Sequence, residues 1–165
     1  HSQPQPIVHR DIKPANILVH GHSAMLGDLG LAKVLMGENR ENAAEIQAYA
    51  AMPYFHRTPE LVAIARGQDV NLTPASDIYQ LGLVLYRAIT GFNPQKPPKN
   101  DIRDQIELDL RAIVGAGGVR LEALLSAMLE DDPRRRPDAQ QLLRDLNMVH
   151  REVCEADYGA TGVMR

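Results

Sequence analysis

The chain has 165 residues, of which 44% are hydrophobic and 24% are charged, and this is the composition of an ordinary globular protein. With 18 basic and 21 acidic side chains the net charge is −3, which excludes a general attraction to nucleic acid or to an anionic membrane. The most apolar segment, residues 78–89, is too short to span a bilayer and contains a glutamine and an arginine. The single cysteine, Cys154, cannot form an internal disulfide, so we expect a reducing, cytoplasmic location.

The length suits one domain or a large part of a bigger one. The first residues, His1 to Pro6, contain neither an initiating methionine nor the charged and then apolar profile of a signal peptide. We therefore expect the sequence to be a piece of a longer protein.

The predicted strands are short and lie in the first part of the chain. Residues 7–8, 17–20 and 23–26 are β-branched or apolar runs, and Gly21 can turn the second run into the third. From Leu31 to Arg57 the hydrophobic periodicity is weak, which predicts a mobile loop with no more than a helical turn.

The rest of the chain has helical patterns. Thr73 and Pro74 predict a helix start, apolar residues then repeat at helical spacing, and Gly91 predicts the end of that helix. Further helices are predicted over residues 100–114, over residues 121–129, and from Asp138 onward, where Asp138 and Gln141 form a variant of the capping box. Residues 1–149 would form the domain, and residues 150–165 a C-terminal tail that frays from Cys154.

The chemically informative string is His9-Arg10-Asp11-Ile12-Lys13-Pro14-Ala15-Asn16, between two predicted strands. A carboxylate can accept the proton of an attacking hydroxyl, a lysine can offset charge on a moving phosphoryl group, and an amide oxygen can hold Mg²⁺. The string Asp28-Leu29-Gly30 adds a second carboxylate for the metal, and Gly30 permits a sharp turn. Together these groups indicate phosphoryl transfer.

These motifs resemble the eukaryotic-type (Hanks-type) serine/threonine protein kinases, and specifically the C-terminal lobe of their catalytic domain. The first string matches H-R-D-x-K-x-x-N, the second stands where the family has D-F-G, and Thr58-Pro59-Glu60 stands where it has A-P-E. Residues 76–82 resemble the buried-helix motif and residues 132–137 the C-terminal arginine segment. The resemblance covers residues 7–146. It implies a mainly α fold, a helical bundle with short β-hairpins that carry the catalytic loop, with the N-lobe absent.

The resemblance also implies a role for each matching residue. Asp11 would be the catalytic base, Lys13 a catalytic residue that contacts phosphate, and Asn16 and Asp28 the Mg²⁺ ligands that help to bind ATP. The residues with implied structural roles are His9, Arg10, Gly30, Glu60, Asp77 and Arg136. Of these, His9 would pack in the interior, Asp77 would brace the backbone of the catalytic loop, and Glu60 would pair with Arg136.

The leading interpretation is a fragment of a kinase that, in the full-length parent, transfers the γ-phosphate of ATP to a serine or threonine hydroxyl of a protein. We expect little activity from this chain alone, because the glycine-rich loop and strand lysine of the family do not precede His9. The expected partners are a protein substrate and the missing N-lobe of the same parent, with no nucleic acid and no membrane segment.

Two alternatives remain open. A small-molecule phosphotransferase of the aminoglycoside-kinase type shares the His-x-Asp loop, but Arg10, Lys13 and Arg136 favour the protein kinase. A non-catalytic kinase-like scaffold is favoured by Leu29 and by Met52, which replaces a hydrogen-bonding threonine of the family motif. The intact string of residues 9–16 and the acidic residue at position 28 oppose it.

Arg10 is typical of kinases whose activation loop docks a phosphate. Residues 31–57 contain no serine or threonine, so only Tyr49 and Tyr54 could be phosphorylated there. We hypothesise that one of three glutamates supplies a standing negative partner for Arg10, leaving the parent active without modification. The candidates are Glu38, Glu41 and Glu45.

Overall fold

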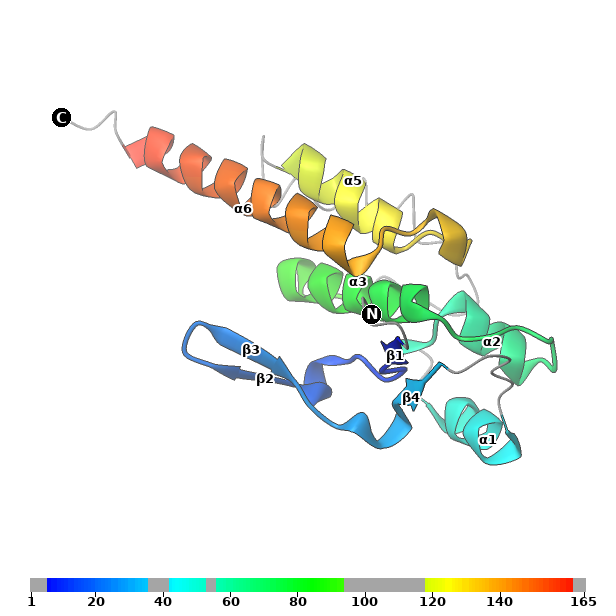
Figure 1. The fold of residues 1–165 in the computed structure, drawn as a ribbon. Helices are drawn as coiled ribbons and strands as arrows, with labels where there is room; N and C mark the ends of the chain where they lie inside the picture. Colours follow the sequence, from blue (N-terminus) through cyan, green and yellow to red (C-terminus); the bar gives the residue numbers. More distant parts are fainter. Residues whose placement is uncertain (1–5, 36–41, 53–55, 94–117, 162–165) are drawn as a thin grey trace.

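The computed structural model describes residues 6–35, 42–52, 56–93 and 118–161 (Figure 1). Its strands are β1 (Ile7–Val8), β2 (Ile17–His20), β3 (Ser23–Leu26) and β4 (Lys33–Val34). Its α-helices are α1 (Ala43–Ala51), α2 (Pro59–Ala65), α3 (Pro74–Thr90), α5 (Gly118–Met128) and α6 (Ala139–Thr161). Short 3-10 turns occupy Pro14–Asn16, Leu29–Leu31 and Pro133–Arg135. The expectation of a mainly helical chain with small antiparallel sheets is confirmed.

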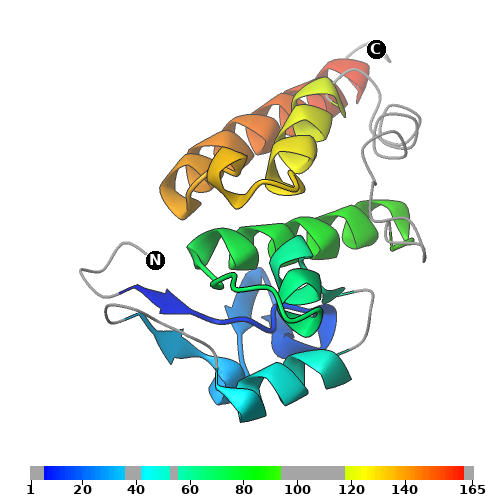
Figure 2. The same ribbon diagram turned by 90° about the vertical axis from the view of Figure 1, so that its right-hand side faces the viewer.

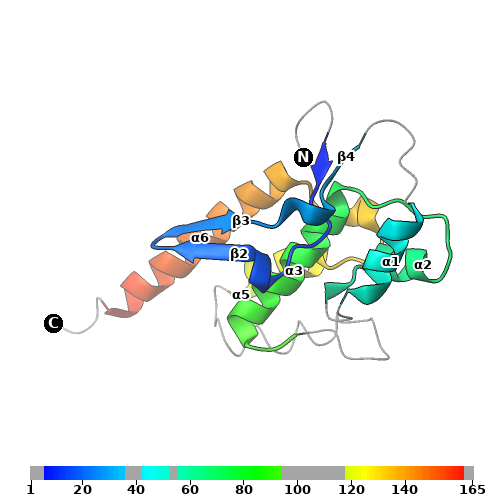
Figure 3. The same ribbon diagram turned by 90° about the horizontal axis from the view of Figure 1, so that it is seen from below.

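The strands form two separate two-stranded antiparallel sheets. Strand β2 pairs with β3 from Ile17↔Leu26 to His20↔Ser23, and Gly21 takes a left-handed φ of 59° in the turn between them. Strand β1 pairs with β4 through Ile7↔Val34 and Val8↔Lys33. The segment that carries residues 9–32 is thereby folded back on itself, and Figure 3 shows the β2–β3 hairpin projecting beside α3.

Helix α3 lies in the middle of the molecule. In Figures 1 and 2 it runs between the α5–α6 pair on one side and the strands with α1 and α2 on the other. The predicted boundaries are confirmed: Thr73 is the N-cap, Pro74 the first helical residue, and Gly91 the C-cap with a φ of 77°. The first half of α3 is therefore buried on both sides, and its polar side chains there must find partners within the protein.

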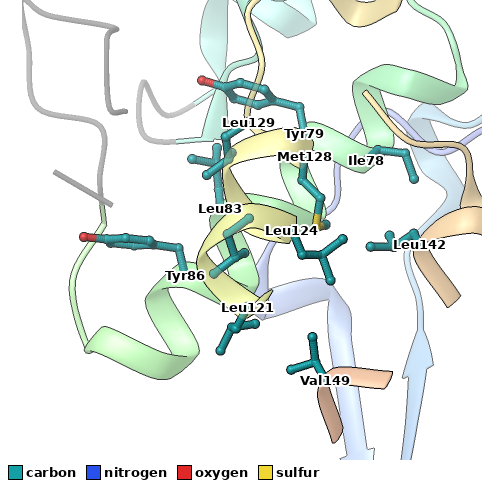
Figure 4. Close-up of a cluster of buried hydrophobic side chains, with 11 residues drawn as sticks. Ile78, Tyr79, Leu83, Tyr86, Leu121, Leu124, Met128, Leu129, Leu142 and Val149 are labelled. Carbon is teal, nitrogen blue, oxygen red and sulfur yellow. The ribbon is translucent and has the colours of Figure 1, made fainter. Parts of the chain in front are cut away.

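The main hydrophobic core lies between α3, α5 and α6 (Figure 4). Gly82 determines how closely α3 approaches α5, because a Cβ atom at this position would lie 3.0 Å from Leu129 Cδ2 and 3.1 Å from Met128 Cβ. A side chain at position 82 would therefore require Leu129 and Met128 to shift by a few tenths of an ångström in a close-packed core. The buried members of this core are Ile78, Tyr79, Leu83, Tyr86, Leu121, Leu124, Leu125, Met128, Leu129, Leu142 and Val149.

The prediction of a mobile loop over residues 31–57 is wrong for residues 43–51, which form α1. Asn42 begins the helix with a capping box: its Oδ1 accepts from Glu45 N at 2.9 Å, and Glu45 Oε2 accepts from Asn42 N at 2.8 Å. Alanine, the best helix former, supplies five of the nine residues of α1. A second core fixes α1 against α2. Its buried members are Tyr49, Met52, Leu61, Ile64 and Leu72.

The C-terminal part agrees with the sequence patterns except at its end. Helix α5 begins three residues before the predicted helix over residues 121–129 and ends one residue before its predicted end, and Asp138 Oδ1 accepts from Gln141 N at 2.7 Å at the start of α6. Helix α6 continues to Thr161, beyond Cys154, where fraying was predicted. The helix predicted over residues 100–114 lies outside the described residues. Within the described ranges, no helix combines the length and apolarity needed to cross a membrane.

Candidate active site

The loop of residues 9–16 begins with a strained backbone that α3 holds in place. Arg10 is a non-glycine residue with a left-handed φ of 71°, a conformation that persists only where neighbours enforce it. The carboxylate of Asp77 accepts from His9 N through Oδ2 and from Arg10 N through Oδ1, each at 2.8 Å. Burial raises the pKa of Asp77, while the two donated N–H groups oppose that rise. The structure thus brings Asp77 onto the backbone of the loop.

Three of the predicted site residues meet at Asp11. Lys13 Nζ lies 2.7 Å from Asp11 Oδ2, and Asn16 Nδ2 donates to the same oxygen at 3.1 Å and to the Asp11 carbonyl at 2.8 Å. Asp11 is 6% exposed, and its Oδ1 has no hydrogen-bond partner among the described residues. One carboxylate oxygen is therefore held by neighbours, and the other keeps its capacity to accept a proton.

A backbone hydrogen bond connects the residue before Asp28 to Asn16. Gly27 N donates to the Asn16 carbonyl at 2.8 Å, and the Gly27 carbonyl lies 3.0 Å from Nε2 of buried His9. The next residue, Asp28, has a φ of 59° and accepts from Gly30 N through Oδ1 at 3.2 Å. A Cβ atom at position 30 would lie 3.1 Å from that oxygen, so a side chain there would require the Asp28 carboxylate to shift by a few tenths of an ångström.

Asn16 and Asp28 are chemically suited to Mg²⁺. The amide nitrogen of Asn16 is committed to Asp11, which leaves its oxygen as the group that can face a cation. Mg²⁺ commonly takes one or two protein oxygens and completes its shell with water and phosphate. In the described parts of the chain no three His, Cys, Asp or Glu side chains form a cluster suited to a metal. Asn16 and Asp28 would thus supply two of the oxygen ligands of such an ion.

The side chain of Arg10 reaches α1. Its Nη1 lies 2.9 Å from Glu45 Oε1 and donates to Tyr49 Oη at 2.6 Å, and its guanidinium lies 5.9 Å from the centre of the Tyr49 ring. Lys33 Nζ lies 3.3 Å from the other carboxylate oxygen of Glu45. Of the three glutamates considered as partners, Glu45 makes the contact. Glu38 and Glu41 lie outside the described residues.

Glu60 and Arg136 form a buried ion pair that joins α2 to the segment before α6. Arg136 Nη1 lies 2.6 Å from Glu60 Oε1, Nη2 lies 3.0 Å from Oε2, and the two side chains are 0% and 3% exposed. Ser76 Oγ donates to Glu60 at 2.9 Å, and the guanidinium stacks 4.8 Å from the ring centre of Tyr79. The pair is nearly enclosed, with both charges hydrogen-bonded as burial requires.

Comparison with known proteins identifies the family of this chain. Residues 1–147 match the family described as protein kinase domain. The chain belongs to the protein kinase family. Ribosomal protein S6 kinase alpha-6 of Homo sapiens is 33% identical over 165 aligned residues, which cover 90% of this chain and 20% of that protein. Serine/threonine-protein kinase AtPK2/AtPK19 of Arabidopsis thaliana is 35% identical over 138 residues, which cover 82% of this chain and 27% of that protein. The kinase chain therefore spans less than a third of either relative.

The sequence patterns did not identify two further residues near the kinase site. Gln80, on α3, is 1% exposed and makes three hydrogen bonds, two of them to the loop of residues 9–16. His56 is close enough to Lys13 and Asp11 for their charges to act on it. Its pKa is lowered by burial and by the positive charges of Lys13 and Arg87, against the opposing effect of Asp11. A glutamine three residues after Asp77 in an apolar helix was the available signal for Gln80.

Other sequence features of the kinase chain are accounted for locally. Met52 is buried in the core between α1 and α2, and its carbonyl accepts from the Arg57 guanidinium at 2.8 Å and 3.0 Å. Thr58 Oγ1 accepts from Leu61 N at 3.1 Å and caps α2. His20 and His22 are exposed at the end of the β2–β3 hairpin, as expected for histidines at a strand end and a turn.

Proposed function

We propose that this chain is the C-terminal lobe of a serine/threonine protein kinase. In the full-length protein it would take part in transferring the γ-phosphate of ATP to a serine or threonine hydroxyl of a protein substrate. The carrying observation is the geometry at Asp11, where one carboxylate oxygen contacts Lys13 and Asn16 and the other has no partner among the described residues. The family match and the serine/threonine kinases among the relatives support the same reaction class.

In this proposal the chain's own residues orient and deprotonate the nucleophile. Mg·ATP, when bound, supplies the phosphoryl group and a metal charge that offsets its negative oxygens. Asp11 Oδ1 accepts the hydroxyl proton of the substrate, while Asn16 keeps Oδ2 in place. Lys13 Nζ, 2.7 Å from Asp11, brings a positive charge to the point where negative charge develops. Asn16 and Asp28 would hold the metal.

We further propose that a second lobe, on the longer natural protein, covers the nucleotide. The β2–β3 hairpin supports this proposal, because Leu18 and Met25, which pair across the strands and share one face of the sheet, are 59% and 57% exposed. Such a surface is favoured where another part of the protein packs against it.

The 165-residue chain alone should bind Mg·ATP weakly, because half of the nucleotide site would be open to water. We expect a calorimetric titration with Mg·ATP to show no saturation below about 1 mM. The longest natural chain that contains these residues, titrated in parallel, should bind more tightly. Micromolar binding by the 165 residues would contradict the need for a second lobe.

We propose that Glu45 acts as the standing negative partner of Arg10 and keeps the parent kinase active without phosphorylation of residues 31–57. The Arg10 side chain is 1% exposed, so losing the charge of its partner leaves a buried cation undercompensated. Glu45→Gln should lower kcat by about tenfold, the equivalent of one lost charge-assisted hydrogen bond. Steady-state phosphotransfer by the longest natural chain measures this effect.

The matched control is Glu152→Gln, which removes a carboxylate paired with Arg120 on the surface at 2.7 Å. It should leave kcat unchanged, and treatment of the wild type with a phosphatase should do the same. Mass spectrometry showing that activity depends on phosphorylated Tyr49 would contradict the proposal. Tyr49 is 1% exposed, and its hydroxyl already accepts a hydrogen bond from Arg10.

A further inference from the structure

The buried amide of Gln80 sits between two segments that lie far apart in the sequence. Its Oε1 accepts from Ile12 N at 2.8 Å, and its Nε2 donates to the Arg10 carbonyl at 3.0 Å and to the His56 carbonyl at 3.2 Å. A glutamine amide has two N–H donors and one carbonyl oxygen, so every polar atom of the group is used. If the amide were rotated by 180°, its N–H groups would face the N–H of Ile12 and its oxygen would face the carbonyls of Arg10 and His56. Only the observed orientation of the Gln80 amide makes all three hydrogen bonds.

The two bonds to the catalytic loop bracket the catalytic base. The Arg10 carbonyl belongs to the peptide group before Asp11, and the N–H of Ile12 belongs to the peptide group after it. Holding both peptide groups restricts both backbone dihedrals of Asp11, and with them the direction in which its carboxylate points. The third bond attaches the same amide to residue 56, two residues before the N-cap of α2.

Gln80 acts together with Asp77. The two residues are three positions apart on α3, a spacing that puts them on one helix face. Asp77 holds the N–H groups of His9 and Arg10, and Gln80 holds the carbonyl of Arg10. The left-handed Arg10 is thereby fixed on both sides of its Cα, as a strained residue requires.

We propose that Gln80 is a positioning residue for phosphoryl transfer, which fixes the backbone on both sides of Asp11 and couples it to the segment at His56. This inference rests on the proposed function, because it requires Asp11 to be the base. The coupling to the segment at His56 is the bond from Gln80 Nε2 to the His56 carbonyl at 3.2 Å.

The test uses Gln80→Met in the longest natural chain that contains these residues. Methionine keeps the length and volume of the side chain but removes all three hydrogen bonds. We expect kcat per folded molecule to fall by about tenfold to a hundredfold, the cost of a misplaced reacting group, while KM for Mg·ATP stays unchanged. Leu83→Ala is the matched control, because Leu83 is buried on the same helix and packs in the hydrophobic core. It should lower stability and leave kcat per folded molecule unchanged.

A double-mutant cycle with Asp11→Asn separates positioning from folding. If Gln80 acts through Asp11, then Gln80→Met should lower kcat no further in the Asp11→Asn background. If the methionine variant does not fold, Gln80→Glu takes its place in the cycle, because it keeps the shape and the acceptor for Ile12 but opposes two carbonyls with oxygen. Wild-type kcat in either folded variant, multiplicative effects in the cycle, or failure of both variants to fold would overturn the proposal.

The cycle also distinguishes failure of this inference from failure of the proposed function. A wild-type protein without phosphotransfer, or one that Asp11→Asn leaves fully active, contradicts the proposed function itself. An active wild type that Asp11→Asn disables and Gln80→Met does not affect contradicts only the role of Gln80.

Discussion

Asp11→Asn should lower kcat of the longest natural chain containing this sequence by about 10²- to 10⁴-fold, the usual contribution of a positioned general base. Asparagine keeps the size of the side chain and an oxygen for Lys13 and Asn16, which contact Asp11 at 2.7 Å and 3.1 Å. It cannot take up the proton of the attacking hydroxyl. KM for Mg·ATP should change little, because Asp11 is not a nucleotide ligand in this mechanism. Transfer of labelled γ-phosphate to a generic protein substrate measures both parameters.

The control for this experiment is Asp69→Asn, which makes the same chemical change at an exposed position. It should retain wild-type kcat. Equal activity in the wild type and Asp11→Asn would end the catalytic claim and favour a kinase-like scaffold. Normal thermal unfolding of the Asp11→Asn chain would show that the loss of activity is chemical.

Glu60→Gln should lower the free energy of unfolding of the chain by about 3–5 kcal/mol, because it leaves the Arg136 cation buried without a counter-charge. The Arg136 side chain is 0% exposed, so water cannot replace the lost carboxylate. The carbonyls of Ala75 and Glu130 still accept hydrogen bonds from the guanidinium, at 2.9 Å and 2.7 Å, which favours the lower end of that range. Urea unfolding followed by circular dichroism measures the change.

Combining Glu60→Gln with Arg136→Met should cost less than the sum of the two single changes, because the pair is removed as a unit. Arg134→Met is the control two residues away. Arg134 is 88% exposed and pairs with Asp132 at 2.8 Å on the surface, so its loss should not change stability measurably. If Glu60→Gln proved as mild as Arg134→Met, the buried pair would not hold α2 to the segment before α6.

Local patterns predicted much of the fold. Helix α3 has strong apolar periodicity, proline at its first position and glycine at its end, and each of these signals acts within a few residues of its own position. Helix α1 was missed because its stability depends on other features. It has an asparagine capping box and many alanines, and Tyr49 and Met52 bury it against α2. Whether a weakly amphipathic helix of this kind forms depends more on tertiary packing than on its own hydrophobic pattern.

The cluster of side chains at Asp11 could be predicted because its members are neighbours in the chain. Asp11, Lys13 and Asn16 lie within six positions, so a single loop brings them to one point. The roles assigned to them remain predictions of the proposed function. Asp28 is farther along the chain, and the hydrogen bond between Gly27 and Asn16 at the base of the β2–β3 hairpin connects its segment to the loop of residues 9–16.

By itself, the sequence determined the identity and order of the chemical groups, the principal helices and the protein kinase resemblance, because all of these are recorded in short stretches of chain. Only the tertiary structure decided which distant groups meet. Arg10 pairs with Glu45, which lies 35 positions away in the sequence. Gln80 forms hydrogen bonds with loop residues 68 and 70 positions away, and Arg136 pairs with Glu60, 76 positions away. These pairings follow from the packing of α3 between two layers, which buries polar groups that then need partners and is not encoded by residue spacing.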